Sequence, residues 1–371
     1  MPAQAMKVDG ITRRTIWLAD DNESVCVIDQ RQLPHHLEIV TLRSMEDAAR
    51  AISEMWVRGA PLIGVTAAYG LCLALRHDPS DASLHAAYQR LLATRPTAVN
   101  LRWALDQMTA HLLSVETGAR AASASVKASA IAEADVASCS SIGDHGLTLI
   151  REQSLRKGGP LGILTHCNAG WLATVDWGTA LAPIYKAANA GIDLMVYVDE
   201  TRPRNQGASL TAWELAQHGV PLTVIVDNAG GHLMQRGLID LCIVGSDRTT
   251  ATGEVCNKIG TYLKALAAHD NQIPFYAALP HSTIDWSLHD GLSQIPIEER
   301  DSREVTHIRG LTDSGSWAEV ALTPPQSPAL NYGFDITPAR LVTGIITERG
   351  IAEASQEGRA ALYPREAISG R

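Results

Sequence analysis

Four times between residues 161 and 285, a short apolar run ends abruptly in a cluster of small and polar residues. The runs are residues 161–165, 192–198, 239–244 and 273–279. Nearly all-apolar runs of this length are typical of strands buried on both faces of a parallel sheet. Helical patterns separate them, which favours right-handed crossovers. The sequence therefore predicts an α/β fold with a doubly wound, Rossmann-like parallel sheet.

The polar clusters would lie at the carboxyl ends of these strands. Cys167 follows the first run, Gln206 lies in the loop after the second, and Asp247 follows the third. Lys258 comes a little further along the chain. Because ligands of open parallel sheets bind beyond the carboxyl ends of the strands, we expect these side chains to line one active site.

The length of 371 residues favours two domains over a single core. Residues 1–145 predict a mostly helical domain with a small antiparallel sheet. Ser44 and Asp47 mark the start of one of its helices. A solvated helix is expected over residues 119–135. Residues 146–371 are predicted to form the Rossmann-like domain.

Local pattern alone gives four further expectations for the second domain. Residues 257–269 favour a helix, and residues 296–336 are expected to be irregular. Thr337-Pro338 predicts the start of a last helix through Thr347. The chain is expected to fray from about Ala352.

Composition excludes several classes of protein. The net charge of −9 argues against a nucleic-acid surface, and two Phe give no base-stacking platform. The six cysteines are scattered without a CxxC pair, which disfavours metal and disulfide frameworks and favours a reducing cytoplasm. Residues 60–75 are uncharged but too short to span a membrane, so a buried helix is expected there. No GxGxxG or P-loop motif follows a predicted strand, and no residues have metal-ligand spacing.

Two interpretations of Cys167 stay open. It is either a buried structural cysteine or a thiol activated at a sheet edge, where helix amides favour the thiolate. His166 is adjacent on an extended segment and so points the opposite way, which argues against a Cys–His dyad. Asp247 is either a loop cap or an acid whose pKa a closed pocket raises.

Several cationic and polar residues suit an anionic, hydroxylated ligand. Arg58, Gly59 and Ala60 precede the apolar helix and form a plausible phosphate cradle, and Arg95 adds a second guanidinium. Asn257 and Lys258, expected at the first turn of a helix, would form another anion site. The amide of Gln206 can hold a sugar hydroxyl.

These segments jointly resemble the methylthioribose-1-phosphate isomerase family, which is related to the regulatory subunits of the nucleotide-exchange factor of translation initiation. The matching motifs include Arg58-Gly-Ala-Pro-Leu-Ile-Gly, Arg95-Pro-Thr-Ala-Val-Asn-Leu, Ile163-Leu-Thr-His-Cys-Asn-Ala-Gly, Glu200-Thr-Arg-Pro-x-x-Gln-Gly, Leu210-Thr-Ala-Trp-Glu-Leu, Asp247-Arg, Asn257-Lys-Ile-Gly-Thr-Tyr, Ile295-Pro-Ile-Glu-Glu-Arg and Ile345-Ile-Thr-Glu-Arg-Gly. They extend from about residue 40 to 350. The chain departs from the usual pattern at Ser209, Thr252 and Tyr332-Gly333.

The resemblance implies an aldose–ketose isomerase that acts on 5-methylthioribose 1-phosphate in methionine salvage. It implies a cytoplasmic homodimer without a metal or organic cofactor. Cys167 and Asp247 correspond to the catalytic pair of the family. Its substrate contacts correspond to Arg58, Gly59, Ala60, Arg95, Gln206, Asn257 and Lys258.

Two other functions remain as alternatives. An isomerase of ribose 1,5-bisphosphate would need a cationic partner for a second phosphate. A non-catalytic regulatory subunit of the exchange factor would share the fold without any need for Cys167 and Asp247, both of which this chain keeps.

Overall fold

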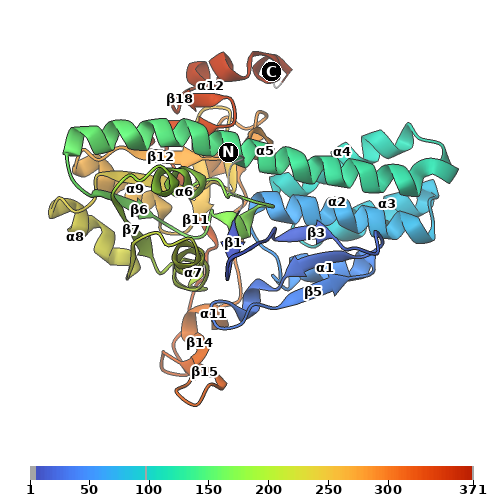
Figure 1. Cartoon of the computed structure of the whole chain (residues 1–371), viewed down its shortest axis with the longest axis horizontal. Coiled ribbons are helices and arrows are strands. Elements are labelled where there is room, and N and C mark those ends of the chain that lie inside the picture. Colours follow the sequence, from blue (N-terminus) through green and yellow to red (C-terminus); the bar gives the residue numbers. More distant parts are fainter. Residues whose placement is uncertain (1–5, 97, 370–371) are drawn as a thin grey trace.

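The computed structural model describes residues 6–96 and 98–369. Thr97, which belongs to the motif that begins at Arg95, and the first residues of the chain lie outside that description. Figure 1 shows a helical half and a sheet half side by side, with the long helix α5 (Arg120–Lys157) crossing both. Among the described residues, no helix is long and apolar enough to cross a membrane.

The N-terminal half is helical with small antiparallel sheets, as predicted. Its helices are α1 (Met45–Ser53), α2 (Ala60–His77), α3 (Asp81–Leu92) and α4 (Val99–Leu113). Its strands are β1 (Lys7–Val8), β2 (Ile11–Thr12), β3 (Ile16–Leu18), β4 (Val25–Ile28) and β5 (Ile39–Leu42). Ser44 and Asp47 form a complete capping box at the start of α1. The uncharged stretch that begins α2 is buried almost throughout, which explains why it needs no polar face.

Helix α5 extends the helix expected over residues 119–135 to 38 residues. Gly143 and Gly146 of α5 explain the close packing of this helix on α6 (Ala182–Asn189). A Cβ on Gly146 would lie 2.3 Å from the Pro183 ring, so only glycine fits there. The helix passes residue 145 without a break, and the division of the chain into domains at that point stays a prediction.

The main sheet confirms the Rossmann-like expectation. Its strands are β6 (Leu161–Thr165), β7 (Leu194–Asp199), β8 (Leu222–Ile225), β9 (Leu241–Val244), β12 (Phe275–Ala278), β17 (Gly344–Thr347) and β18 (Gly350–Ala352). Their spatial order is β18-β17-β12-β9-β6-β7-β8, with β18 antiparallel at one edge. Alternate residues of β6 enter different cores: Ile163 packs with residues of α5 and α6, and Leu164 packs with α8 (Gly230–Gln235) and α9 (Thr261–Asp270).

The order of the strands reverses between β6 and β9. From β6 the chain proceeds to β7 and β8 on one side, whereas from β9 it proceeds to β12 and β17 on the other. This is a topological switch point, where the loops that leave adjacent strands separate and open a crevice. Cys167 follows β6 and Asp247 follows β9, so both lie at that crevice.

The expectation of a helix over residues 257–269 is wrong at its start. Asn257 and Lys258 end strand β11 (Val255–Lys258), which pairs with β10 (Arg248–Thr250) and β16 (Phe334–Thr337). Helix α9 begins only at Thr261, after Gly260 has turned the chain with a φ of 101°. The pairing with a strand so distant in sequence overrides the local helical pattern.

Three expectations for the C-terminal region are also wrong. Residues 296–336 contain helix α11 (Arg303–Thr306), the hairpin of β14 (His307–Leu311) and β15 (Trp317–Ala321), and the start of β16. The predicted helix after Thr337 is a short 3₁₀ turn (Ala339–Leu341) followed by β17, because the Gly-Ile-Ile-Thr of β17 pairs with β12 inside the sheet. The end is helical in α12 (Gln356–Leu362) and α13 (Pro364–Ser369).

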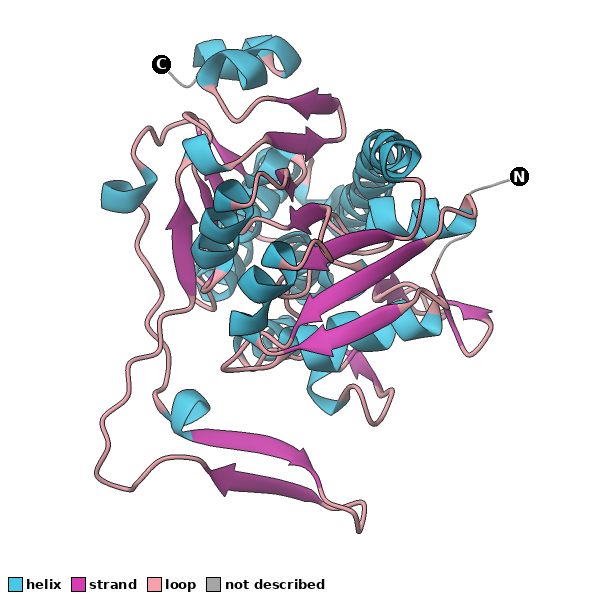
Figure 2. Cartoon of the chain, turned by 90° about the vertical axis from the view of Figure 1, so that its left-hand side faces the viewer, coloured by secondary structure: helices cyan, strands magenta, loops and turns pink. Residues whose placement is uncertain are grey.

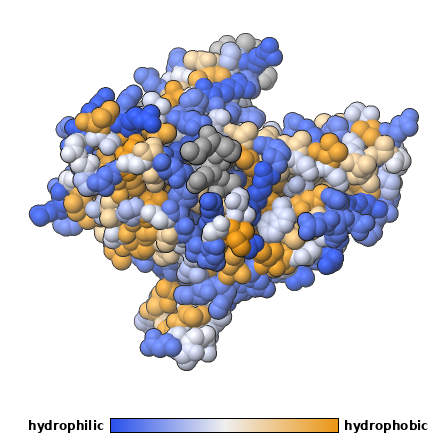
Figure 3. Space-filling model, in the orientation of Figure 1, coloured by the Kyte–Doolittle hydropathy of each residue, from blue (hydrophilic) through white to orange (hydrophobic). Residues whose placement is uncertain are grey.

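The hairpin β14–β15 stands away from the rest of the molecule on two extended connections (Figure 2). Apolar surface covers part of this projection in Figure 3. Val320 on β15 and Leu322 just after that strand are exposed. Trp317 contacts the N-terminal half through the ring of His35, with 5.4 Å between the ring centroids. The remaining helices and strands are α7 (Ala212–Gln217), β13 (Ile284–Asp285), which pairs with β10, and α10 (Gly291–Gln294).

Candidate active site

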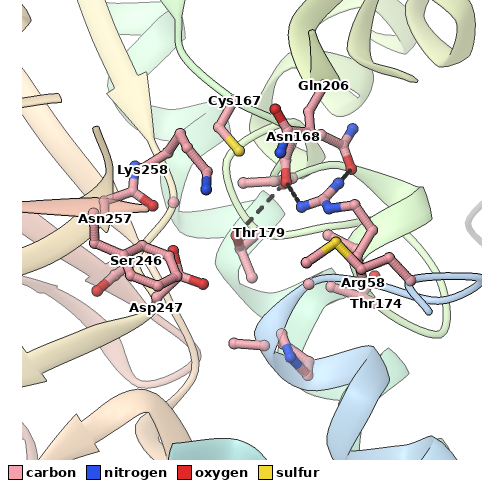
Figure 4. Close-up of a pocket in the computed structure, with 18 of the residues that line it drawn as sticks. Arg58, Cys167, Asn168, Thr174, Thr179, Gln206, Ser246, Asp247, Asn257 and Lys258 are labelled. Atoms are coloured by element: carbon pink, nitrogen blue, oxygen red, sulfur yellow. Dashed lines mark hydrogen bonds between the residues drawn. The ribbon is translucent and has the colours of Figure 1, made fainter. Parts of the chain in front are cut away.

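One pocket at the switch point contains every site residue proposed from the sequence (Figure 4). Arg58, Gly59 and Ala60 come from the start of α2, Arg95 precedes α4, Cys167 and Asp247 follow β6 and β9, Gln206 follows β7, and Asn257 and Lys258 end β11. The pocket has about 720 Å³ of empty space, its open mouth included.

Cys167 has a left-handed backbone conformation, with a φ of 67°. Its N–H donates to Thr201 Oγ1 at 2.9 Å, and its carbonyl accepts from Thr211 Oγ1 at 2.7 Å. A non-glycine residue persists in this conformation only where its surroundings hold it, at a cost of about 1–3 kcal/mol. The result is a thiol that points into the pocket (Figure 4). The ring of His166 points away from it, towards Asp199, as the alternation along the strand predicted.

Asp247 is fixed by its own backbone, whose N–H donates to the carbonyl of Cys256 at 2.9 Å. Burial raises the pKa of its carboxyl above the ordinary value, and the positive charges of Lys258 and Arg95 oppose that rise without cancelling it. A carboxyl in this condition keeps its proton at a higher pH than an exposed aspartate does. Asp247 is therefore suited to donate a proton.

The Lys258 amine lies between Cys167 and Asp247 in Figure 4. Its Nζ donates to the carbonyl of Gly333 at 2.9 Å and lies 4.7 Å from the centroid of the Phe334 ring. Burial lowers its pKa, whereas Cys167 and Asp247 act to raise it. The departure from the family pattern at Gly333 thus lies against this lysine. Thr252, another departure, is in the turn that precedes β11, at the opposite end of that strand from Lys258.

Arg58 is held by Asn168, a residue that the sequence did not single out. Its Nη1 donates to Asn168 Oδ1 at 2.5 Å and its Nη2 to the Asn168 carbonyl at 2.7 Å. Asn168 in turn donates to Thr211 and Glu214, which belong to the Leu210-Thr-Ala-Trp-Glu-Leu motif. Gly59 has a φ of 97°, and a Cβ there would lie 2.4 Å from the Ala173 carbonyl oxygen, so glycine is required.

Arg95 is the first member of a chain of ion pairs along the wall of the pocket. Glu298 pairs with Arg95 at 2.8 Å and with Arg300 at 2.7 Å. Glu304 continues the chain, at 2.7 Å from both Arg300 and Arg204. Arg300 and Arg204 also line the pocket and were missed from the sequence, although Glu298 and Arg300 belong to the Ile295-Pro-Ile-Glu-Glu-Arg motif.

Most of the charged side chains that line the pocket are cationic. The described residues that line it include Arg58, Arg95, Arg204, Lys258 and Arg300, whereas Asp247 is the only acidic one among them. Gln206 adds a buried side-chain oxygen, Oε1, that has no hydrogen-bond partner in the described part of the chain. Such a pocket favours an anion that also carries hydroxyl groups.

The only group of described residues with metal-ligand proximity is His166, Asp199 and Asp227, whose ligand atoms lie within 4.8 Å. It does not fit a cation. The amine of Lys264 lies 3.3 Å from Asp199 Oδ2, and the backbone N–H groups of Thr201 and Arg202 each donate to Asp227 at 2.7 Å. These donors already balance the negative charges of Asp199 and Asp227, which would otherwise bind the metal.

Glu214 should make the stability of the folded protein depend on pH. Burial raises its pKa from 4.5 to about 7, although Asn168 and the backbone N–H of Leu172 donate to it. The folded state therefore binds a proton that the unfolded state loses above about pH 4.5, so stability falls as pH rises from there to about 7 and is then constant. The effect is about 3 kcal/mol. Glu214→Gln should lose this dependence, seen as a smaller difference in Tm between about pH 5 and 8.

The exposed Glu116 provides the control, because Glu116→Gln should leave the wild-type pH profile of Tm intact. An unchanged profile in Glu214→Gln would mean that Glu214 is ionised in the folded protein throughout this range.

Comparison with known proteins agrees with this fold and this pocket. The model of the initiation factor 2 subunit family matches residues 56–354, which defines the class. Within it, the chain is 64% identical over 359 residues to the methylthioribose-1-phosphate isomerase of Methylorubrum extorquens, covering 97% of this chain and 98% of that protein. It is 62% identical to the enzyme of the same name from Paramagnetospirillum magneticum, over 98% of this chain and all of that protein. The chain therefore belongs to the methylthioribose-1-phosphate isomerase family.

Solved structures extend the comparison. The 5-methylthioribose 1-phosphate isomerase of Pyrococcus horikoshii is 37% identical with a TM-score of 0.81, and the match covers 95% of this chain and 96% of that one. The subunit delta of translation initiation factor eIF-2B from A. fulgidus is 35% identical with a TM-score of 0.78, over 95% of this chain and all of that one. Proteins named for different functions thus share one fold, so the residues of the site distinguish their functions and the fold does not.

Proposed function

We propose that this protein converts 5-methylthioribose 1-phosphate into 5-methylthioribulose 1-phosphate, an aldose–ketose isomerisation in methionine salvage. The observation that carries the proposal is an acid of raised pKa, Asp247, that shares a cationic pocket with the Cys167 thiol. Relatives that are 61–65% identical over nearly the whole chain are named for this isomerase.

The reaction is difficult because the phosphate on the anomeric oxygen prevents ordinary ring opening. Asp247 donates its proton to the ring oxygen as the bond between carbon 1 and that oxygen breaks. Hydrogen then moves from carbon 2 to carbon 1, and the hydroxyl on carbon 2 gives its proton to the Asp247 carboxylate as the ketone forms, which restores the acid. Cys167 either takes the carbon-2 proton as a base or stabilises the transition state of a hydride shift.

The phosphate binds at Arg58, at the free N–H groups near Gly59 and Ala60, and at Lys258. No side chain of the described residues caps the start of helix α2, so its first N–H groups are free to bind an anion. Arg95, Gln206 and Asn257 hold the hydroxyl groups and complete the binding site. The free Oε1 of Gln206 supports that role, because a hydroxyl would satisfy it.

Lys258→Ala should lower kcat/KM at least about tenfold, because a charged hydrogen bond to phosphate contributes about 1.5–3 kcal/mol. Steady-state kinetics on the folded variant measure the effect. Lys7→Ala, at an exposed lysine, is the control. Wild-type kinetics in Lys258→Ala would remove this lysine from the proposed phosphate site.

A coupled assay with both candidate sugar phosphates tests the function. We expect turnover of 5-methylthioribose 1-phosphate and much slower turnover of ribose 1,5-bisphosphate, because Arg204 and Arg300 are already paired with Glu304. Turnover should survive dialysis against a chelator. Preference for the bisphosphate, or activity that only a divalent ion restores, would contradict the proposal.

The proposal also includes a homodimer in the cytoplasm, as the family resemblance implies. Sedimentation at several protein concentrations measures the state of association.

A further inference from the structure

His166 is buried beside Cys167, yet the proposed reaction does not use it. Its ring nitrogens make two hydrogen bonds of 2.8 Å, from Nδ1 to Asp199 Oδ2 and from Nε2 to the carbonyl oxygen of Ile259. Only 1% of the residue is exposed, so water does not replace either partner. Gly260 leaves room for the ring, because a Cβ there would lie 3.1 Å from Cε1 and Nε2.

Both partners of the ring are acceptors. A backbone carbonyl only accepts, and the carboxylate of Asp199, whose Oδ2 also lies 3.3 Å from the amine of Lys264, accepts as well. A neutral imidazole has a single N–H and satisfies one of these acceptors, whereas an imidazolium satisfies both. The surrounding charges are those of Asp199 on β7, Lys264 on α9, Asp335 on β16 and Asp227 after β8.

The two bonds join three segments that carry the site. His166 immediately precedes Cys167, Asp199 ends the strand that leads to Gln206, and Ile259 immediately follows Lys258. Cys167 needs such support because its left-handed backbone is strained. From this geometry we propose that His166 is a positioning residue whose imidazolium form ties the Cys167 loop to the ends of β7 and β11.

The proposal assigns a separate function to each bond. The bond to Asp199 holds the Cys167 loop on β7, so its loss should reduce kcat through misplacement of the thiol. The bond to Ile259 holds the end of β11 against the same loop, so its loss should raise KM through displacement of Lys258. This division depends on the proposed isomerase function, whereas the charge on the ring does not.

Nuclear magnetic resonance of protein labelled with ¹⁵N-histidine tests the charge without substrate. One histidine should have both ring nitrogens protonated at about pH 7, and its signals should disappear in His166→Gln. Asp199→Asn, which removes the charged acceptor, should return the ring to a single proton at the same pH. A wild-type His166 with one protonated nitrogen at about pH 7 would overturn the imidazolium.

Kinetics of two variants test the positioning. His166→Asn keeps a donor near the Nδ1 position, so KM should rise about tenfold with a smaller change in kcat. His166→Gln keeps a donor near the Nε2 position, so kcat should fall about tenfold with KM near that of the wild type. His269→Asn, at an exposed histidine on α9, is the control. Equal losses of stability with wild-type kcat and KM would make His166 purely structural.

The ring signals also separate the two proposals. A doubly protonated His166 in a protein that turns over neither sugar phosphate would overturn the proposed function and leave the charge assignment intact. Full isomerase activity with a neutral His166 would overturn the charge assignment and leave the proposed function intact.

Discussion

Asp247→Asn should reduce turnover by about two to four orders of magnitude, the usual contribution of a general acid. Asparagine keeps the size of the side chain and its hydrogen-bonding capacity but has no acidic proton to give to the ring oxygen. Burial raises the pKa of Asp247 because the ionised form loses its hydration, so the protonated form is the one that the pocket favours. The variant should fold normally, since it replaces a group that is costly to ionise there.

The pH profile supplies a second measurement on the same residue. The proposed mechanism needs the acid form of Asp247, so kcat should fall as pH rises through its raised pKa. Lys258 and Arg95 limit how far that pKa is raised, so a variant without the positive charge of Lys258 should lose activity at a higher pH than the wild type does. Asp193→Asn, at an exposed aspartate before β7, should leave the profile unchanged. More than a tenth of wild-type turnover in Asp247→Asn would contradict the role of this residue as the acid.

The parallel sheet could be predicted because its strands carry their own signal. β6 and β9 are wholly buried, and burial on both faces leaves a continuous apolar run in the sequence. Residues at the carboxyl ends of such strands, among them Cys167 and Asp247, could be assigned to one edge for the same reason.

Strand β11 could not be predicted in this way. Its Val-Cys-Asn-Lys sequence is neither a long apolar run nor strictly alternating, and β16, its partner, begins at Phe334. The pairing with β16 makes this segment a strand instead of a helix. It also places Lys258 against Gly333. The sequence thus predicted Lys258 as a site residue but gave it the wrong local structure.

The residues that could not be predicted contact site residues that are far away in the sequence. Asn168 holds Arg58 across 110 positions of the chain, and Glu298 pairs with Arg95 across 203. No local pattern encodes such contacts. The motifs that contain Glu214 and Glu298 were noticed as family features, and the structure gives them a physical explanation. Glu214 fixes Asn168, the partner of Arg58, and Glu298 pairs directly with Arg95.

Cys167→Ser should lower kcat strongly while KM changes little, because serine keeps a small polar group and loses the ionisable, polarisable sulfur. The effect should be second only to that of Asp247→Asn. Serine fits the same left-handed backbone, and its N–H and carbonyl keep their bonds to Thr201 and Thr211. The structural interpretation of Cys167 predicts the opposite result, a variant with nearly full activity and altered stability. Cys242→Ser, at a buried cysteine inside β9, is the control for a merely structural thiol.

The fate of the hydrogen on carbon 2 then separates the two functions proposed for the thiol. If Cys167 removes that hydrogen as a proton, turnover in heavy water should place deuterium on carbon 1 of the product, because a thiol exchanges with solvent. If the hydrogen moves as hydride, the product should keep the substrate's own hydrogen, and Cys167 stabilises the transition state. Cys167 is 7% exposed, so a shielded base can return the same proton. Deuterium in part of the product therefore identifies a base, and complete retention favours the hydride shift.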